Sequence, residues 1–302
     1  MQRSIPEICL KLINKKVLVT GGAGFIGSNL CEELVHRKTG EIYSLDNYSM
    51  GSEKNHVAGV NYIRGDTRNI SELLTVQADL VFHLGEYSRV EQSFQDFRKV
   101  WHYNKIGTFE VLEYCKNTGA KLIYAGSSTK FGDGGLNRSE SPYAWSKASN
   151  TELIKNYGDW FNLEYAIAYF YNAYGPREIS SGKYATLIAV FAEKMRKKQP
   201  LTVVSPGHQK RNFTHVSDIV EGLILIAEKG CGDNFGIGSE EEFSILEIAN
   251  KFGGAIEYLP ERRGNRMKAD LITDKTRSLG WKCQNSIDEY IDCLRRNYWE
   301  SE

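Results

Sequence analysis

A tyrosine and a lysine four residues apart are the feature of this sequence best suited to chemistry. Tyr143 and Lys147 stand in the run SPYAWSKA, and a proline just before the tyrosine is typical of a helix start. Residues i and i+4 share one face of a helix, so the lysine ammonium can stabilise a phenolate and hold a ribose hydroxyl. A phenolate can act as a general base. The pair predicts a catalytic dyad, although two surface residues would give the same pattern.

A hydroxyl group that could assist this tyrosine stands sixteen residues before it. Residues 122–125 form an apolar run that predicts a strand, and Gly-Ser-Ser-Thr follows it. Open α/β folds bind their ligands at the carboxyl ends of parallel strands. We therefore expect Ser127 to be the catalytic hydroxyl, with Ser128 also beside the substrate. A serine-rich turn without function is the alternative.

Glycines after the first apolar run indicate a phosphate site. Residues 17–27 read VLVTGGAGFIG, a strand that enters a glycine turn and then a helix. Gly21, Gly24 and Gly27 permit a tight turn. Backbone N–H groups at the helix start, around Phe25 and Ile26, can then bind a pyrophosphate, because the helix dipole favours negative charge there.

An acidic residue after the second predicted strand indicates which dinucleotide binds. Asp46 stands nineteen residues past Gly27, where a carboxylate can accept both hydrogen bonds of an adenosine ribose diol and would repel a 2′-phosphate. Asn47 follows it, where an NADP enzyme could carry an arginine. The pattern favours NAD over NADP, although Asp46 could also be a simple turn residue.

The elements that must position these residues alternate along the chain. Short apolar runs separated by amphipathic stretches predict βαβ units on a parallel sheet. We expect an α/β fold with a Rossmann-type doubly wound parallel sheet and a smaller C-terminal substrate-binding lobe. Residues 1–175 would bind NAD, with 212–238 returning to that domain, and 176–211 and 239–302 would form the lobe. The predicted strands are 17–20, 42–45, 62–64, 80–84, 122–125 and 164–169, and the predicted helices include 25–37, 70–75, 96–116 and 143–161.

Composition narrows the range of partners. The 302 residues include 38 basic and 38 acidic side chains, so the formal net charge is zero and no nucleic-acid or membrane partner is indicated. The six cysteines form neither a CxxC pair nor a Cys/His cluster, which favours reduced thiols over a disulfide framework or a metal site. Without a signal-like or membrane-length apolar run, we expect a cytoplasmic protein that acts on a small molecule.

In this order and spacing, the motifs resemble the extended short-chain dehydrogenase/reductases, and within them the nucleotide-sugar epimerases and dehydratases of the UDP-glucose 4-epimerase type. Three further runs match that family: YNKIGT at 103–108, FYNAYGPR at 170–177 and QKRNFTHVSD at 209–218. The resemblance implies additional cofactor contacts at Asp66, Leu84, Gly85 and Asn104, besides those at Tyr143 and Lys147. It implies substrate contacts at Asn172, Arg211 and Arg262.

The resemblance also implies a reaction. In the family the sugar C4 hydroxyl loses its proton to the tyrosine and its hydride to NAD⁺, which gives a 4-keto sugar. Dehydratases of the family carry Asp-Glu, and decarboxylases Ser-Glu, where this chain has Ser128 and Thr129. C4 epimerisation is therefore the first expectation, in the synthesis of polysaccharide precursors. The predicted helices 96–116 and 143–161 are long enough to pack against a partner subunit, so we expect a homodimer.

Two alternatives stay open. One is a 4,6-dehydratase or C4-dehydrogenase that releases a 4-keto sugar, since Glu86 stands where the family usually has alanine and could supply other acid/base chemistry. The other is a non-catalytic NAD-sensing protein.

Overall fold

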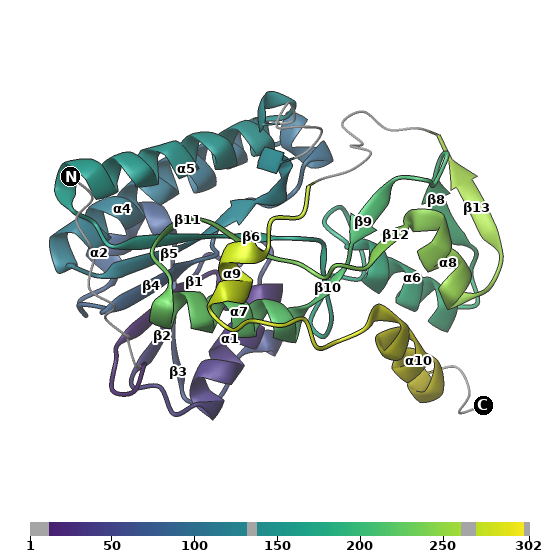
Figure 1. Cartoon of the computed structure of the whole chain (residues 1–302), viewed down its shortest axis with the longest axis horizontal. Coiled ribbons are helices and arrows are strands. Elements are labelled where there is room, and N and C mark those ends of the chain that lie inside the picture. Colours follow the sequence, from purple (N-terminus) through teal and green to yellow (C-terminus); the bar gives the residue numbers. More distant parts are fainter. Residues whose placement is uncertain (1–11, 132–137, 261–269, 299–302) are drawn as a thin grey trace.

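A seven-stranded parallel sheet forms the centre of the molecule (Figure 1). The computed structural model describes residues 12–131, 138–260 and 270–298. The strands lie in the order β11-β6-β5-β4-β1-β2-β3, the doubly wound order of a Rossmann-type fold, which confirms the predicted fold class. Their bounds are β1 Val17–Thr20, β2 Ile42–Asp46, β3 Val60–Arg64, β4 Leu80–His83, β5 Lys121–Ser127, β6 Tyr165–Phe170 and β11 Gly232–Ile237.

Burial explains why these segments are strands. The central strands β1, β4 and β5 are buried along their whole length, as expected for a parallel sheet that is covered on both faces. The edge strand β3 has no fully buried residue. All six predicted strands are present, and β5 continues two residues further than expected, so that it ends at Ser127 itself.

Helices cover both faces of the sheet (Figure 1). One apolar cluster includes Leu30 and Leu223 and joins two helices to the sheet, and a second includes Val111 and Ile154 on the other face. The helices of the first cluster are α1 Phe25–His36 and α7 Val216–Lys229, and those of the second are α2 Ile70–Leu73, α4 Gly107–Thr118 and α5 Pro142–Phe161. In the described ranges no helix combines the length and apolarity needed to cross a bilayer.

The helix predicted over 96–116 contains a wider turn than expected. It consists of α3 Phe97–Val100, the π-helix η4 Trp101–Ile106 and α4. Asn104 lies within this turn, and its side chain accepts a hydrogen bond from the Tyr87 backbone N–H (2.7 Å) and donates to the Tyr87 carbonyl (3.0 Å). Turns of this kind occur often at functional sites.

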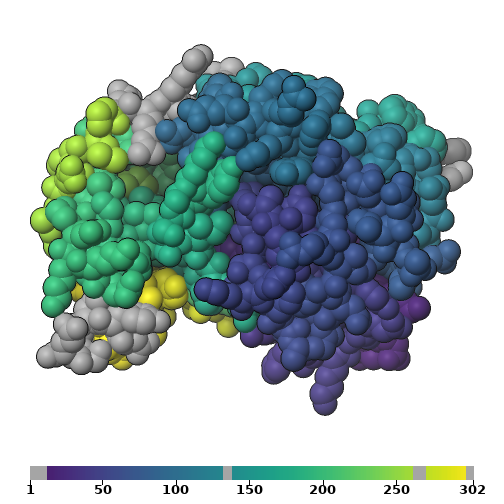
Figure 2. All heavy atoms as spheres, turned by 180° about the vertical axis from the view of Figure 1, so that it is seen from behind, coloured from purple at the N-terminus to yellow at the C-terminus, as the bar shows by residue number. Residues whose placement is uncertain are grey.

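A smaller lobe follows β6 in the chain and has its own core, which includes Phe191 and Phe252. It lies beside the carboxyl ends of the sheet strands in Figure 1, and in the space-filling view from behind its green and yellow residues lie opposite the purple and blue ones of the N-terminal half (Figure 2). Its strands pair two by two: β8 Leu201–Val204 with β13 Ile256–Leu259, and β9 Lys210–Asn212 with β12 Glu242–Ser244. Its helices are α6 Leu187–Arg196, α8 Ile245–Phe252 and α10 Ile287–Tyr298.

Two short segments connect the lobe to the sheet. β7 Ala173–Tyr174 pairs in parallel with β10 Thr214–His215, directly before α7. The chain then returns to the sheet through α7 and β11, and α9 Asp274–Ser278 packs near β11. The remaining 3-10 turns are η1 Glu53–Asn55, η2 Thr67–Asn69, η3 Glu91–Phe94 and η5 Ser128–Phe131.

Candidate active site

A cavity of about 700 Å³ lies between the sheet and the lobe. The carboxyl ends of β1, β2, β4, β5 and β6 line one side of it, and α6, β8 and β9 line the other. The structure brings most of the predicted site residues to this cavity: Gly21, Gly24, Phe25, Ile26, Gly27, Asp46, Asn47, Leu84, Gly85, Ser127, Ser128, Tyr143, Lys147, Asn172 and Arg211. Asp66 and Asn104 are not part of its lining, and Arg262 lies outside the described residues.

The glycine turn between β1 and α1 leaves room for a phosphate. Gly21 has a φ of +74°, in the left-handed region that favours glycine. A methyl group on Gly27 would lie 2.1 Å from the Gly21 carbonyl oxygen. The N-cap of α1 is Gly24, which has no side chain that could cap the first turn, and residues 24–27 line the cavity. This cradle fits the pyrophosphate of a dinucleotide.

Asp46 ends β2 with its carboxylate held in place. Its Oδ2 accepts a hydrogen bond from Ala23 N (3.0 Å) and its Oδ1 from Tyr48 N (2.7 Å). Burial raises the pKa of Asp46, and these two backbone hydrogen bonds oppose the rise. A carboxylate has about four acceptor positions, so two remain for a ribose diol. The site residues thus fit NAD.

Asp66 and Asn104 support the cavity from outside its lining. Asn47 Nδ2 donates to Asp66 Oδ2 (3.1 Å), and Arg68 Nε donates to its Oδ1 (2.9 Å). Burial alone would raise the pKa of Asp66, but the bonds from Arg68 and Asn47 bring it below its ordinary value. The Asn104 side chain hydrogen-bonds the Tyr87 backbone and donates to Ser146 Oγ (2.9 Å). Direct contact of either residue with the cofactor stays a prediction.

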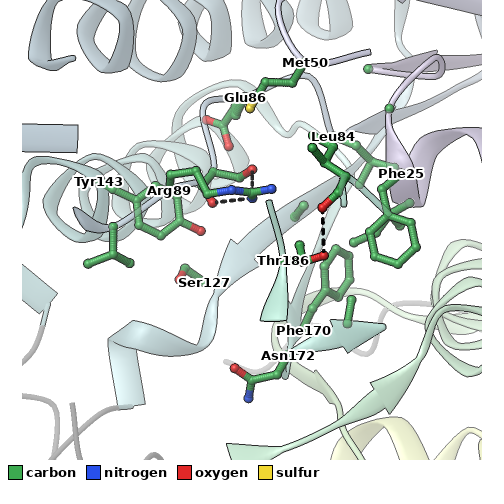
Figure 3. Close-up of a pocket in the computed structure, with 18 of the residues that line it drawn as sticks. Phe25, Met50, Leu84, Glu86, Arg89, Ser127, Tyr143, Phe170, Asn172 and Thr186 are labelled. Carbon is green, nitrogen blue, oxygen red and sulfur yellow. Dashed lines mark hydrogen bonds between the residues drawn. The ribbon is translucent and has the colours of Figure 1, made fainter. Parts of the chain in front are cut away.

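The Tyr–Lys dyad lies at the start of α5. Ser141 is the N-cap and accepts from Ala144 N (3.1 Å), and Pro142 follows it, so the helix begins where the proline predicts. In Figure 3 the phenol of Tyr143 points toward Ser127. Ser127 Oγ lies 2.9 Å from Thr129 Oγ1, which keeps the serine hydroxyl at the strand end beside the cavity. Base and hydroxyl therefore face one ligand space.

Glu86 is part of the cavity lining, but its carboxylate is directed at Lys147. Lys147 Nζ donates to the Glu86 carboxylate and to the Ala125 carbonyl (2.6 Å). The Glu86 side chain is only 1% exposed, and its Oε1 accepts from Thr108 Oγ1 (2.6 Å), Asn150 Nδ2 (3.0 Å) and Tyr124 OH (3.2 Å). This position does not suit a carboxylate that exchanges protons directly with a sugar.

Arg89 and Glu178 are ionisable residues of the cavity lining that no sequence motif singles out. Arg89 extends across it alongside Tyr143 (Figure 3), and its Nε donates to the Tyr184 carbonyl (3.0 Å). Glu178 accepts from Gly175 N (2.9 Å), and burial raises its pKa to about 7. Both lie on irregular segments, where no periodic pattern predicts which side chain turns inward. The only clue to Glu178 is its place directly after the GPR run.

The substrate side of the cavity depends on the junction between β6 and the lobe. Asn172 follows β6 with a φ of +35°, and its Nδ2 donates to the Asn212 carbonyl (3.1 Å). Arg211 lies on β9, and its Nη1 donates to the Lys210 carbonyl (2.7 Å). A guanidinium on a cavity wall opposite the glycine turn suits a second phosphate-bearing ligand.

The glycine turn, strand-end acid, serine hydroxyl and Tyr–Lys pair in one cavity define a dinucleotide-dependent enzyme of the Rossmann class. The model of the NAD dependent epimerase/dehydratase family matches residues 17–238, and the chain belongs to this family. The predicted resemblance and the choice of NAD as cofactor are thereby confirmed.

Individual relatives carry several activities. The chain is 32% identical to UDP-glucuronic acid decarboxylase 6 of Arabidopsis thaliana, over 94% of this chain and 89% of that protein. It is 30% identical to a putative UDP-glucose 4-epimerase of Methanocaldococcus jannaschii, over 91% and 95%. The solved UDP-glucose 4-epimerase of Thermus thermophilus, in complex with NAD, has 26% identity, covers 95% of this chain and 100% of its own, and superposes with a TM-score of 0.85. The family is thus certain, while its members differ in reaction.

Proposed function

We propose that this protein is an NAD-dependent nucleotide-sugar 4-epimerase. The observation that carries the proposal is that Ser127 and Tyr143 share one cavity with the glycine turn, while hydroxyl residues occupy positions 128 and 129. The sugar would be oxidised at C4 to a transient ketone and reduced again on its other face. Nothing in that cycle needs a carboxylate after the strand-end serine.

Each residue of the site has its own role in this reaction. Tyr143 takes the proton of the C4 hydroxyl and later returns it, while Ser127 hydrogen-bonds the same oxygen and holds it near the phenol. Lys147 stabilises the phenolate. NAD⁺, held by the glycine turn and Asp46, would supply the group that takes up and returns the C4 hydride. A cavity of about 700 Å³ supports the turning of the keto sugar between the two hydride transfers.

We assign the substrate to the nucleotide-sugar class. Arg211, on the wall opposite the glycine turn, and Asn172, at the junction between β6 and the lobe, support this assignment because both line the cavity and offer donors suited to a diphosphate. Solved relatives were crystallised with UDP-glucose and with UDP-glucuronic acid. We assign cofactor binding to residues 1–175 with 212–238, and sugar-nucleotide binding to 176–211 and 239–302, which include Arg262.

A second candidate is an enzyme that releases the 4-keto sugar as a dehydratase or dehydrogenase. Glu178 favours it, since a cavity carboxyl with a pKa near 7 can give and take a proton at neutral pH. Ser128 and Thr129 weigh against classical dehydration and against the decarboxylation performed by the plant relatives. A role as a pure NAD sensor would need none of Ser127, Tyr143 and Lys147, and is therefore the weakest candidate.

We also propose a homodimer, with an interface formed by the exposed faces of α5 and η4. Large apolar side chains are exposed there, including Trp101 (43%), Trp145 (38%) and Trp160 (63%), and the rings of Trp101 and Trp145 stack at 6.0 Å. Trp145→Glu should yield monomers by analytical ultracentrifugation. Tyr258→Glu, on an exposed aromatic of β13, is the matched control and should leave the mass unchanged. A wild-type monomer would contradict the proposal.

Proton NMR of the purified protein with NAD⁺ and a panel of UDP-, GDP-, dTDP- and CDP-sugars tests the function, with NADH absorbance followed in parallel. A new anomeric signal from the C4 epimer without accumulating NADH supports the epimerase and identifies the nucleotide. A keto product supports the second candidate, as dehydratase when NADH stays absent and as dehydrogenase when it accumulates. No conversion of any sugar would count against both.

A further inference from the structure

The catalytic lysine is tied to a buried acid that its function does not require. An ammonium group carries three hydrogen-bond donors. Lys147 directs one to Glu86 and one to the Ala125 carbonyl (2.6 Å), and its Nζ lies 4.9 Å from the centre of the Tyr124 ring. One donor remains for a ribose hydroxyl or for Tyr143. Glu86 thus fixes the direction of the Lys147 side chain and offsets its positive charge.

A chain of hydrogen bonds from Thr20 through His83 and Thr108 determines whether Glu86 donates or accepts. Thr20 Oγ1 accepts from the backbone N–H groups of Leu84 (3.1 Å) and Gly85 (3.0 Å). Its own hydrogen must therefore point to His83 Nδ1, 2.7 Å away, which makes that nitrogen an acceptor. Burial lowers the pKa of His83 to about 4, in agreement with a neutral ring. The ring proton then lies on Nε2.

The same reasoning continues to the carboxylate. His83 Nε2 donates to Thr108 Oγ1 (3.0 Å), so the Thr108 hydrogen points to Glu86 Oε1 (2.6 Å). Asn150 Nδ2 and Tyr124 OH donate to the same oxygen. Because every neighbour donates, Glu86 is required to accept at both oxygens, which is the behaviour of a carboxylate. Two backbone N–H groups favour this orientation: Gly85 donates to Thr20 Oγ1, and Leu84 divides its N–H between Thr20 Oγ1 and the Thr20 carbonyl (3.2 Å).

The other charged and titratable groups around this pair do not supply an equivalent negative charge. On β4, His83 is neutral, and on β5, burial raises the pKa of Tyr124 well above its ordinary value. From η4, Lys105 Nζ donates to Ser149 Oγ (3.0 Å) and Asn150 Oδ1 (2.7 Å). Arg89 is a second cation near Tyr143, and burial lowers its pKa. Among the described residues, Glu86 is the carboxylate that contacts Lys147.

We propose that Glu86 is a positioning residue that locks Lys147 against β5, balances its charge, and thereby sets the pH range in which Tyr143 serves as base. The inference rests on the proposed use of the Tyr143–Lys147 dyad with NAD⁺, but not on which sugar is converted. With Glu86 present the ammonium stabilises the phenolate less than an unbalanced lysine does.

Tyrosinate absorbance tests the proposal without any substrate. The signal of Tyr143 is the titration of each protein minus that of the same protein carrying Tyr143→Phe, recorded with and without NAD⁺. Glu86→Gln should lower the midpoint by about 1 pH unit, because the ammonium loses its counter-charge. Glu86→Asp should restore the midpoint at least in part. Where turnover is measurable, the acid limb of kcat/KM against pH should move the same way.

Glu113→Gln is the matched control. This carboxylate on α4 also contacts a lysine and a tyrosine, Lys116 and Tyr157, but does not line the cavity. It should leave the Tyr143 midpoint unchanged. An unchanged or raised midpoint in a folded Glu86→Gln protein would overturn the proposal, because a merely structural acid alters stability alone.

A crystal structure of the wild-type NAD⁺ complex gives an answer even if the Glu86 variants do not fold. We expect Lys147 Nζ to keep its contacts with Glu86 and the Ala125 carbonyl and to reach the cofactor with one hydrogen bond. A lysine that leaves Glu86 to hold two ribose hydroxyls would contradict the inference. Neither experiment depends on the reaction, so the epimerase proposal can fail separately.

Discussion

The two walls of the cavity are built in different ways. On the cofactor wall, backbone groups hold the chemistry: glycines shape the turn, and two backbone N–H groups fix Asp46. On the substrate wall, Arg211 lies on a three-residue strand and hydrogen-bonds the carbonyl of the preceding residue. Backbone-defined sites tolerate little change, whereas side chains on short strands can be replaced within one fold. We therefore expect cofactor binding to be more sensitive to substitution than binding of the second ligand.

The largest expected effect lies where the two walls meet. Tyr143→Phe should lower kcat by roughly 10³-fold, within the range for loss of a general base, because Tyr143 is the residue assigned to take the proton of the C4 hydroxyl. NAD⁺ affinity and thermal stability should stay close to wild type, as measured by fluorescence titration and by thermal unfolding. Tyr165→Phe, on β6 outside the cavity lining, is the control and should retain full activity. Retained turnover in Tyr143→Phe would refute the assignment of the base.

NAD⁺ affinity should fall sharply when a side chain is added at the glycine turn of the cofactor wall. In Gly27→Ala the new methyl group would lie 2.1 Å from the Gly21 carbonyl oxygen, so the turn must open. We expect NAD⁺ to bind about 100-fold more weakly, which corresponds to roughly 3 kcal/mol. Gly24→Ala, with a contact of 3.1 Å to the same oxygen, should have a smaller effect. Equal losses in calorimetric titrations would show that the turn is not the rigid part of the site.

A substitution on the substrate wall should change the affinity for the nucleotide sugar rather than the rate of the reaction. Arg211→Ala should raise KM for the nucleotide sugar by about 10-fold while changing kcat little, because a charge-assisted hydrogen bond contributes about 1.5–3 kcal/mol and is made before and during the reaction. NAD⁺ affinity should not change. Lys210→Ala, at the neighbouring exposed position paired with Glu242, is the control. A large fall in kcat would place Arg211 near the reacting atoms instead.

Glu178 should produce the smallest effect, on stability. Its pKa is about 7 in the folded chain against an ordinary value of 4.5, so the folded state binds this proton more tightly than the unfolded state. The contribution of this group is therefore favourable at low pH and is lost as the pH rises from about 4.5 to 7. The Tm difference between Glu178→Gln and wild type should grow in favour of the variant across this window. A constant difference would contradict the raised pKa.

The sequence is informative where a motif constrains the backbone. The strand–glycine–helix run, Asp46, and Tyr143 with Lys147 all line the cavity as predicted, since each sits at a fixed place relative to a strand end or helix start. The sequence did not predict the π-turn at Trp101–Ile106, because one wider turn inside a helix changes the hydrophobic periodicity too little to be recognised.

The remaining site residues depend on tertiary contacts. Glu86 was recognised as unusual, but its burial against Lys147 follows from the packing of α5 on β5, which no local pattern encodes. Arg89 and Glu178 lie on irregular segments and were not predicted at all. Arg262, expected to bind the nucleotide, lies outside the described residues, so its role stays a prediction.

The fate of the hydride at C4 tests the central claim most directly. A nucleotide sugar that carries deuterium at C4, chosen by the NMR panel, is incubated with the protein and NAD⁺ in ordinary water until equilibrium. Our account predicts that the epimer retains the deuterium at C4, because the hydride is taken up and returned within one closed cavity. Epimer that carries hydrogen at C4, with deuterium released to water, would contradict direct hydride return. Deuterium that accumulates on NADH beside a keto sugar would replace the epimerase with a dehydrogenase.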